Sequence, residues 1–205
     1  YIGWIDNKQY FKVENTNKLI LNKPIYSLDL VEFIENNEKE LFTIPIGSDI
    51  SNTSLMNHSF DGKKISGKKD RYSIVNIAHS FLNSPYLWGG KTPFGIDCSG
   101  FTQMVYKING YSLFRDAKNQ ATQGETLSFI EESEPGDLAF FNNENDEIIH
   151  VGIILKNNHI IHASGKVRID RIDHSGIYNN DLNKHTHSLR CLLYTSPSPR
   201  DLRKS

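Results

Sequence analysis

The sequence predicts an α+β domain with a small all-β unit in front of it, and two observations support this prediction. Residues 1–60 contain short runs of β-branched and aromatic residues separated by turn-formers, which is typical of a small barrel. Residues 70–190 start with helical spacing and change, from residue 134 on, to runs with the period of strands. Helices followed by an antiparallel meander define the α+β class.

The composition narrows the classes of protein that fit. The chain has 205 residues, enough for one good-sized domain or two smaller ones. Its 38% hydrophobic and 23% charged residues are ordinary for a globular protein. A formal net charge of −1 gives no electrostatic reason to expect nucleic acid as a partner. No apolar run approaches the roughly 18 residues of a membrane span, and two cysteines exclude a small disulfide framework.

The two ends of the sequence differ from the rest. It starts at Tyr1 with neither a methionine nor a signal peptide, so we expect the true start to be missing. The stretch from Cys191 on back-translates to a sequence that resembles a transposon-end adapter of DNA sequencing libraries. We therefore interpret residues 191–205 as a read-through tail without core contacts, which leaves Cys98 as the sole native cysteine. A buried strand at residues 192–194 would contradict this interpretation.

The region before residue 70 divides into three segments. The G-W-I-D run at residues 3–6 resembles bacterial SH3-like domains. We expect residues 1–16 to be the end of a truncated SH3-like domain and residues 17–60 to form a second SH3-like β domain. Residues 61–69 are polar, glycine-containing and rich in lysine, which indicates a linker.

Two helices and a shorter third one are predicted after the linker. Between Asp70 and Asn83, apolar residues recur at i, i+3, i+4, i+7 and i+8, and Asp70 or Ser73 is placed to cap the helix. A second helix begins at Cys98 and stops near the helix-ending pair Asn109-Gly110. The third covers residues 116–124 and ends at a glycine.

Cys98 is the first candidate for chemistry. It follows a loop rich in proline, glycine and aromatic residues and opens a predicted helix. A helix N-terminus carries unpaired N–H groups and roughly half a positive charge, so a thiolate is expected to be favoured there and to be nucleophilic without a metal. The alternative is a small buried hydrophobic residue, which is what most lone cysteines are.

His150 and His162 are the candidate partners of this thiol, because a thiol nucleophile needs a base and the base needs an orienting group. Both lie in apolar strands that flank a turn at residues 156–158. With a three-residue loop, His162 faces Gly152, so the two histidines become diagonal neighbours on one face of the sheet, within hydrogen-bond reach. A two-residue loop would put them on opposite faces. We expect the Cys98 helix to lie against the face that carries them.

Five motifs in this order, Y-L-W-G-G, D-C-S-G-F, E-P-G-D-L, H-V-G-I-I and I-I-H-A-S-G, resemble the NlpC-type cysteine peptidases, which are papain-like. The resemblance covers residues 70–190. It implies that Cys98 is the nucleophile, that His150 is the base and that His162 orients this base. It also implies that Tyr86 lies near the oxyanion hole, together with the backbone N–H of Cys98.

The same resemblance implies a substrate. The family cuts peptide stems of bacterial cell walls after D-γ-glutamate and before the diamino acid. Members with SH3-like domains ahead of the catalytic domain need a free N-terminal L-alanine, so the expected partner is an L-Ala-γ-D-Glu-diamino acid stem peptide. The expected location is the periplasm or the cell envelope rather than the cytoplasm.

The resemblance also suggests residues that contact the substrate. Asp97 would bind the alanine ammonium, although capping the Cys98 helix is an equally good role for it. Ser99 and Trp88 would line the pocket, with core packing as the alternative for Trp88. Arg115 and Asp116 fall near the family's substrate cleft.

No metal or other cofactor is expected, because His185 and His187, two residues apart, have no nearby partner in the sequence and make a poor metal site. Two other functions stay open. One is a papain-like amidase or acyltransferase that acts on another amide or on a lipid. The other is a non-catalytic wall-binding module, against which the intact set of cysteine and two histidines argues.

Overall fold

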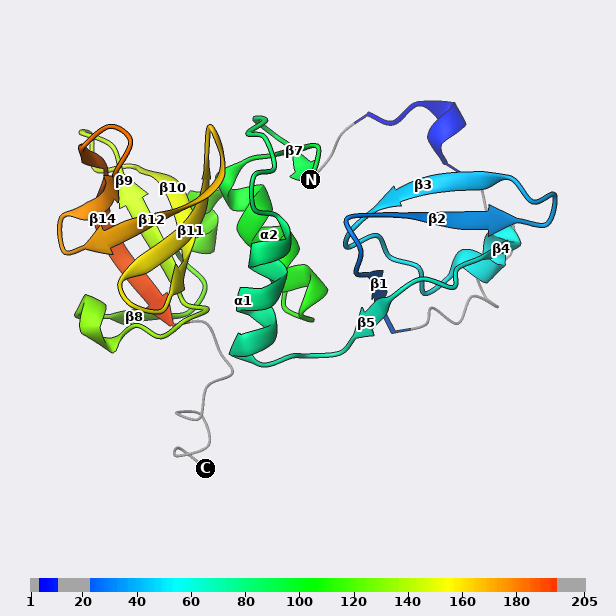
Figure 1. Cartoon of the computed structure of the whole chain (residues 1–205), viewed down its shortest axis with the longest axis horizontal. Helices are drawn as coiled ribbons and strands as arrows, with labels where there is room; N and C mark the ends of the chain where they lie inside the picture. The colour runs from blue at the N-terminus through cyan, green and yellow to red at the C-terminus, as the bar shows by residue number, and fades with distance from the viewer. Residues whose placement is uncertain (1–3, 11–22, 195–205) are drawn as a thin grey trace.

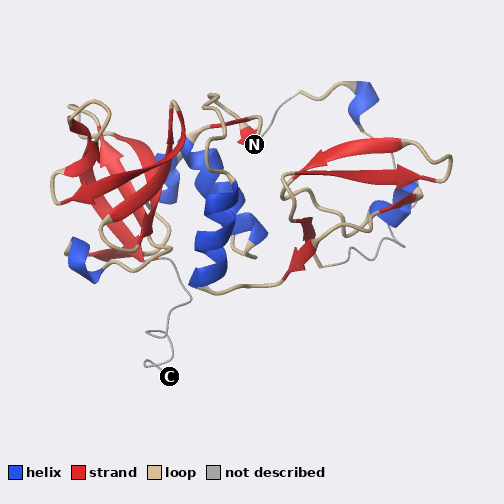
Figure 2. Cartoon of the chain, in the orientation of Figure 1, coloured by secondary structure: helices blue, strands red, loops and turns tan. Residues whose placement is uncertain are grey.

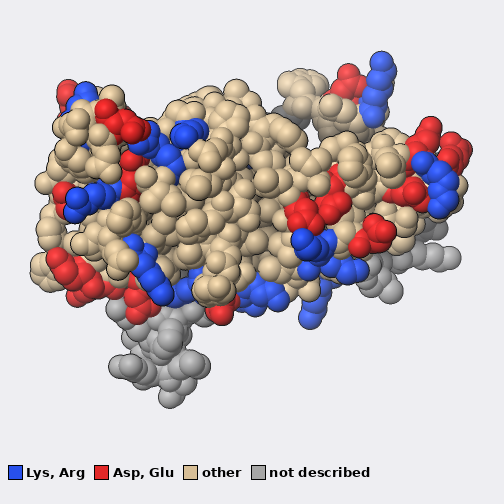
Figure 3. Space-filling view, viewed as in Figure 1, with Lys and Arg blue, Asp and Glu red and all other residues tan. Residues whose placement is uncertain are grey.

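A computed structural model of the chain describes residues 4–10 and 23–194, and these form two units that lie side by side (Figure 1). The N-terminal unit is built of short strands, and the C-terminal unit combines helices with a larger sheet (Figure 2). The helices α1 and α2 stand between the large sheet and the N-terminal unit. On the face seen in Figure 3, basic and acidic side chains are interspersed over both ends of the molecule, so this face has no extended cationic patch.

The N-terminal unit contains two small sheets. Its strands are β1 (Ile25–Ser27), β2 (Val31–Asn36), β3 (Leu41–Pro45), β4 (His58–Ser59) and β5 (Lys64–Ser66), and 3-10 turns cover Asn7–Gln9 and Thr53–Met56. One sheet has the order β3-β2-β4, and β1 pairs with β5. The β-rich character agrees with the sequence, whereas the assignment of residues 17–60 to an SH3-like domain stays a prediction. Residues 1–3 and 11–22, on which much of the predicted first SH3-like domain falls, lie outside the described residues.

The predicted linker is shorter than the sequence suggests. Within residues 61–69, Lys64–Ser66 form β5, and Ile65 pairs with Tyr26 of β1. Ile65 also packs against the main hydrophobic core, which contains Ile46 of the N-terminal unit as well as residues of the C-terminal unit. The charges that surround Ile65 in the sequence do not indicate this strand.

The helices begin close to where the sequence predicts them. Helix α1 covers Arg71–Ser80, and the Asp70 carboxylate accepts a hydrogen bond from the Ser73 N–H at 2.9 Å, as the capping pattern predicts. Helix α2 covers Cys98–Ile108 and is followed by Gly110 at φ 80°, a backbone conformation that suits glycine. Helix α3 covers only Ala117–Gln120 of the predicted 116–124, and its last residue, Gln120, is buried and donates to the carbonyls of Ser99 in α2 and of Phe114 in the preceding loop.

The large sheet closes on itself. Its strands are β8 (Glu125–Leu127), β9 (Leu138–Asn142), β10 (Ile148–Leu155), β11 (His159–Ser164), β12 (Lys166–Asp173), β13 (Gly176–Asn179) and β14 (Lys184–Tyr194), with a 3-10 turn at Ile130–Glu132 and a separate hairpin of β6 (Lys91–Thr92) and β7 (Gly95–Ile96). The order is β13-β12-β11-β10-β9-β14-β8. An additional pairing of β13 with β14 closes the six consecutive strands from β9 through β14 into a barrel-like ring. The α+β fold with its antiparallel meander is therefore confirmed. The closure of the sheet into a barrel was not predicted from the sequence.

The interpretation of residues 191–205 as a tail without core contacts is wrong for its first four residues. Residues 191–194 are the end of β14, in which Leu192 pairs with Leu127 of β8 and with Ala139 of β9. Leu192, Leu193 and Tyr194 are 3%, 2% and 6% exposed. Leu192 and Leu193 point to opposite faces of the strand and pack into the two separate hydrophobic clusters, so this segment is part of the folded sheet. Residues 195–205 lie outside the described residues.

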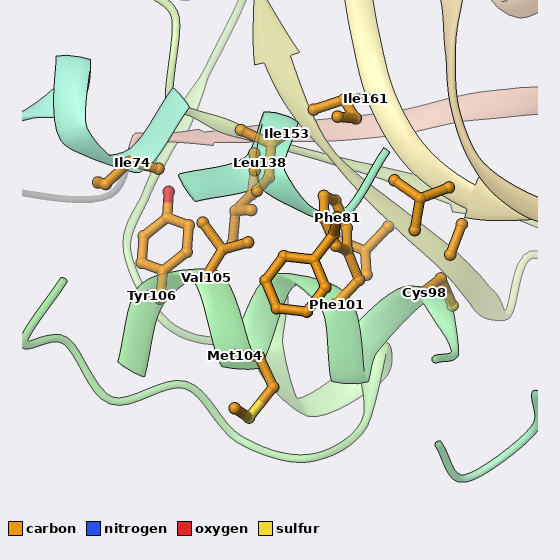
Figure 4. Close-up of a cluster of buried hydrophobic side chains, with 14 of the residues drawn as sticks. Ile74, Phe81, Cys98, Phe101, Met104, Val105, Tyr106, Leu138, Ile153 and Ile161 are labelled. Carbon is orange, nitrogen blue, oxygen red and sulfur yellow. The ribbon is translucent and has the colours of Figure 1, made fainter. Parts of the chain in front are cut away.

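The core has two compartments, one on each face of the barrel wall. On the outer face, Phe101 and Val105 of α2 pack with Ile153 and Ile161 of the barrel, and Figure 4 shows Cys98 at the end of the same row of α2 side chains. The inner compartment contains Phe141, Ile154 and Ile160 among others. Neighbouring residues of one strand therefore belong to different compartments, as the alternation of side chains requires.

Candidate active site

Cys98 is the first residue of α2, as predicted, and its side chain is nearly buried. It is 7% exposed, and its Sγ lies 4.0 Å from the carbonyl oxygen of Ile149, the residue before His150. The preceding Asp97 caps the helix by accepting a hydrogen bond from the Gly100 N–H at 2.6 Å. The helix start thus holds the thiol at the end of the barrel where β10 begins.

The expectation that the helix N-terminus stabilises a resting thiolate is not met. Burial and then the negative charge of Asp97 raise the pKa of Cys98, and nearby backbone N–H groups offset this only in part. Withdrawal from water disfavours an anion by up to several pKa units, whereas a helix terminus contributes about 0.3–1 kcal/mol. Burial therefore favours the neutral thiol over the thiolate, and a nearby base is needed to take its proton before the sulfur attacks.

His150 and His162 meet as the hairpin register predicts. Gly152 pairs with His162 across the β10–β11 hairpin, and the turn occupies residues 156–158. The Nε2 atom of His150 lies 2.8 Å from Nδ1 of His162, and the two rings meet edge to face with centroids 5.0 Å apart. Both side chains are buried, at 6% and 1% exposure. The two histidines form a direct hydrogen-bonded pair.

The face on which this pair lies differs from the expectation. His150 contacts Phe141, a residue of the inner compartment, and the alternation along β10 places His150 with Gly152 and Ile154. Helix α2 packs instead against the opposite face, which carries Val151 and Ile153. The reason is the closure of the sheet, because its inner face is filled by the barrel's own side chains and only the outer face is left for α2. The Cys98 Sγ lies 4.0 Å from the carbonyl oxygen of Ile149, one residue before His150, and no hydrogen bond joins Cys98 to His150 among the described residues.

Asp170 is a buried partner of the histidine pair that the sequence analysis missed. Its Oδ2 lies 3.0 Å from Nε2 of His162, and the carboxylate is 3% exposed. Arg168 binds both carboxylate oxygens, with Nε to Oδ2 at 2.6 Å and Nη2 to Oδ1 at 2.8 Å. A usable signal was present: Gly165 alone connects β11 to β12, and the resulting pairing of His162 with Arg168 makes Asp170 a diagonal neighbour of His162.

His187 is the second residue that the sequence analysis missed. It comes from β14, and its ring stacks on that of His150 with centroids 4.2 Å apart and an interplanar angle of 30°. Burial, followed by the proximity of His162, lowers the pKa of His187 to about 4. The closing β13–β14 pairing brings it here, and no local pattern in the sequence reveals that pairing. In the described part of the chain, no group of three or more histidine, cysteine or acidic residues could hold a metal ion.

The histidine cluster gives a prediction for stability. Burial lowers the pKa values of His150, His162 and His187, while the unfolded chain titrates near 6.5. Between pH 6.5 and about 4 the unfolded state therefore binds more protons, so stability falls as the pH falls. Each fully buried histidine contributes a slope of up to about 1.4 kcal/mol per pH unit. Thermal unfolding at pH 7.5, 6 and 5 should show this loss.

The matched variants of this experiment are His187→Gln and His159→Gln. The first removes one of the buried imidazoles and should make the decline of melting temperature with falling pH shallower. The second changes a histidine that bonds to the Asn157 carbonyl at the outer end of the β10–β11 hairpin, and it should leave the slope as in the wild type. Equal slopes for all three proteins would contradict the assignment.

A cleft of about 890 Å3 opens at Cys98. Five of the residues that the sequence analysis selected line it: Trp88, Asp97, Ser99, Arg115 and Asp116. The Trp88 side chain is 84% exposed, which excludes the core-packing alternative for it. Tyr86 is half-buried and does not line this cleft, although the charges of Cys98 and Asp97, after burial, contribute to raising its pKa.

Asp97 and Arg115 form a bidentate ion pair at the floor of this cleft. The Nη1–Oδ1 and Nη2–Oδ2 distances are 3.0 Å and 2.5 Å, and Nη1 also donates to Ser99 Oγ at 2.9 Å. The Gly89 N–H donates to the same carboxylate at 2.8 Å. Burial alone would raise the pKa of Asp97, but the hydrogen bonds from Arg115, Gly100 and Gly89 outweigh it and lower the pKa. The capping role of Asp97 is therefore confirmed.

Cys98 thus opens a helix, and its Sγ lies 4.0 Å from the carbonyl oxygen of Ile149, which precedes the paired His150. Residues 83–188 match the profile of the NlpC/P60 family, and the chain belongs to this family. In the described part of the chain, no helix is both long and apolar enough to pass through a membrane.

Several characterised proteins are similar to this chain. It is 31% identical over 182 residues to a γ-D-glutamyl-L-lysine dipeptidyl-peptidase of Bacillus subtilis, covering 80% of this chain and 60% of the relative. It is 36% identical over 118 residues to dipeptidyl-peptidase 6 of Lysinibacillus sphaericus, covering 55% of this chain and 41% of the relative. The chain thus spans less than two thirds of the length of these relatives.

The fold has a close counterpart among solved structures. The crystal structure of an NlpC/P60 family protein from Bacillus cereus superposes with a TM-score of 0.74 at 18% identity, covering 95% of this chain and 70% of that one. The NlpC/p60 domain of the peptidoglycan hydrolase SagA covers 62% of this chain and 100% of its own length, with a TM-score of 0.50 at 26% identity.

Proposed function

We propose that the protein is a cysteine endopeptidase that hydrolyses the bond between D-γ-glutamate and the diamino acid of bacterial cell-wall stem peptides. The observation that carries this proposal is the Cys98 thiol at a helix start, 4.0 Å from the carbonyl oxygen of the residue before the paired His150, in a cleft whose lining includes charged side chains. The relatives named as γ-D-glutamyl-L-lysine dipeptidyl-peptidases support the substrate class.

The groups present suffice for hydrolysis through an acyl-enzyme. His150 takes the proton of the Cys98 thiol as the sulfur attacks the γ-glutamyl carbonyl. The resulting oxyanion would accept hydrogen bonds from the backbone N–H of Cys98 and from the Tyr86 hydroxyl. The His150 imidazolium then protonates the leaving amine, and neutral His150 activates the water that releases the glutamyl product.

The cleft favours a charged peptide over a lipid. Its lining includes Arg115, Lys91 and Lys118 along with Asp97 and Asp116, and such a lining would leave an acyl chain against charged groups. This observation favours the peptidase over an acyltransferase. The exposed Trp88 at its rim supplies one flat apolar surface for the substrate.

The ammonium of an N-terminal L-alanine is proposed to bind at the acidic side of this cleft. Asp97 already accepts hydrogen bonds from Gly89, Gly100 and Arg115, so an ammonium that reaches it must share its oxygens with the guanidinium. Asp116 lines the same cleft with an exposed side chain, and it offers a second carboxylate. A cell-wall substrate is consistent with the expected location in the periplasm or cell envelope.

The test uses two peptides and reads the products by mass. The protein is incubated with L-Ala-γ-D-Glu-diaminopimelate and with the same peptide acetylated at its amine, alongside Cys98→Ala. Free diaminopimelate from the unblocked peptide alone, absent with the variant, is the expected result. Cleavage of both peptides would remove the ammonium role of the carboxylates. If neither peptide is cut by a folded protein with a reactive thiol, the peptidase proposal is wrong and amide and lipid substrates come next.

A further inference from the structure

The hydrogen bonds around His162 determine which nitrogen of each histidine carries a proton. We propose that Asp170, held by Arg168, is a positioning residue that fixes the tautomers of His162 and His150 so that Nδ1 of His150 is free to accept the Cys98 proton. This inference rests on the proposed function for its role in catalysis. Asp170 and Arg168 are not among the residues that line the cleft at Cys98.

The first step of the argument is the state of Asp170. Burial would raise the pKa of its carboxyl, but the hydrogen bonds from His162 and Arg168 outweigh burial and lower it. Arg168 in turn reaches Asp181 through Nη2 at 2.8 Å, which ties it to a second carboxylate. Asp170 is therefore ionised, and an ionised carboxylate can only accept hydrogen bonds.

The second step is the tautomer of His162. Because Asp170 only accepts, the 3.0 Å contact between its Oδ2 and Nε2 of His162 requires a hydrogen on Nε2. Burial lowers the pKa of His162 in spite of the opposing effect of Asp170, so the ring is neutral near pH 7. A neutral imidazole has one hydrogen, and Nδ1 of His162 must then be an acceptor.

The third step transfers this constraint to His150. Its Nε2 lies 2.8 Å from the acceptor Nδ1 of His162, so Nε2 of His150 carries the hydrogen. Burial and the neighbouring His162 and His187 lower the pKa of His150, so this ring is neutral too. Its Nδ1 consequently holds a lone pair, which is the form a general base must have.

The proton movement is balanced within this chain of groups. The S–H bond of Cys98 breaks and an N–H bond forms at Nδ1 of His150, which gives a thiolate and an imidazolium. The His150 imidazolium keeps its Nε2 hydrogen and donates a hydrogen bond from it to Nδ1 of His162. The negative charge of Asp170, on the other side of His162, stabilises the positive charge on His150. The charged groups that face His162 are Asp170 and Arg168, and its neutral neighbours are His150 and His187.

The experiment compares Asp170→Leu with Asp170→Asn. Leucine has a similar size but no acceptor, so the tautomer of His162 is no longer imposed. Asparagine can place its amide oxygen at the position of Oδ2, which keeps the acceptor and removes only the charge. The matched control is Asp173→Asn, which changes an acidic residue of the same strand that pairs with the exposed His185.

Three readouts separate positioning from folding. The first is 15N NMR of histidine, which identifies the protonated nitrogen of His150 and His162. The second is the rate at which iodoacetamide alkylates Cys98 at pH 7, located by peptide mass so that Cys191 is scored separately. The third is the split of kcat and KM on the stem peptide. Melting temperatures show which variants are folded.

The expected result is ordered. Asp170→Leu should lose the Nε2–H form of His162 and lower both Cys98 alkylation and kcat by about 10²-fold or more, with KM little changed. Asp170→Asn should keep the tautomer and recover part of the rate, and Asp173→Asn should match the wild type. A folded Asp170→Leu protein with wild-type tautomers and alkylation would overturn the inference. If the wild type cuts no stem peptide, the proposed function fails, while the NMR and alkylation readouts still decide the role of Asp170.

Discussion

Replacing His150 with alanine is expected to lower kcat/KM on the stem peptide by about 10³-fold at pH 7. The loss is large because burial and Asp97 raise the pKa of Cys98, so little thiolate exists without a base. The residual activity of the variant should rise about tenfold per pH unit, because each unit increases the thiolate fraction tenfold until the pKa of the thiol itself is reached. Steady-state rates from pH 6 to 10 measure both effects.

The control for this prediction is His159→Ala, which removes the histidine at the start of β11, next to the turn at residues 156–158. That variant should keep the wild-type rate and pH profile. Alkylation of Cys98 by iodoacetamide should follow the same pattern in both variants, without any need for substrate. An unchanged pH profile in the His150 variant would mean that another group takes the proton, and the stacked His187 would be the first candidate.

Local patterns were enough to predict the centre of the site. The three-residue turn at 156–158 sets the register of β10 on β11, and the period of two then fixes that His150 and His162 share a face. The capping of α2 by Asp97 follows in the same way from the sequence D-C-S-G. Both features depend on residues a few positions apart, and such features are the most reliable to derive from a sequence.

The parts that the sequence did not reveal depend on distant pairing. The closure of the barrel requires β14 to lie between β9 and β13, and this places His187 on His150 and gives Leu192 and Leu193 a buried position. The composition of residues 191–194 contains no information about that partner strand. The raised pKa of Cys98 was not predicted for a related reason, because the burial that outweighs the backbone N–H groups becomes visible only in the folded chain.

Replacing Arg115 with methionine is expected to destabilise the protein by about 3 kcal/mol at pH 7. Methionine keeps much of the packing of the side chain but leaves the Asp97 carboxylate, 5% exposed, without a cationic partner and with only the Gly89 and Gly100 N–H groups and the Ser99 hydroxyl as donors. The pKa of Asp97 should then rise, so the destabilisation should shrink as the pH is lowered and the carboxyl becomes neutral. Urea unfolding at pH 7.5 and pH 5 measures this difference.

The double variant Asp97→Asn, Arg115→Met completes the cycle. If the ion pair is the cause, the double variant should be more stable than the sum of the two single changes implies, because removal of the charge at residue 97 relieves the cost of leaving it unpaired. Lys118→Met is the matched control, since it removes an exposed cation from the same cleft and should change stability by less than about 0.5 kcal/mol. Strictly additive losses in the cycle would show that Arg115 acts through packing and its bond to Ser99 rather than through Asp97.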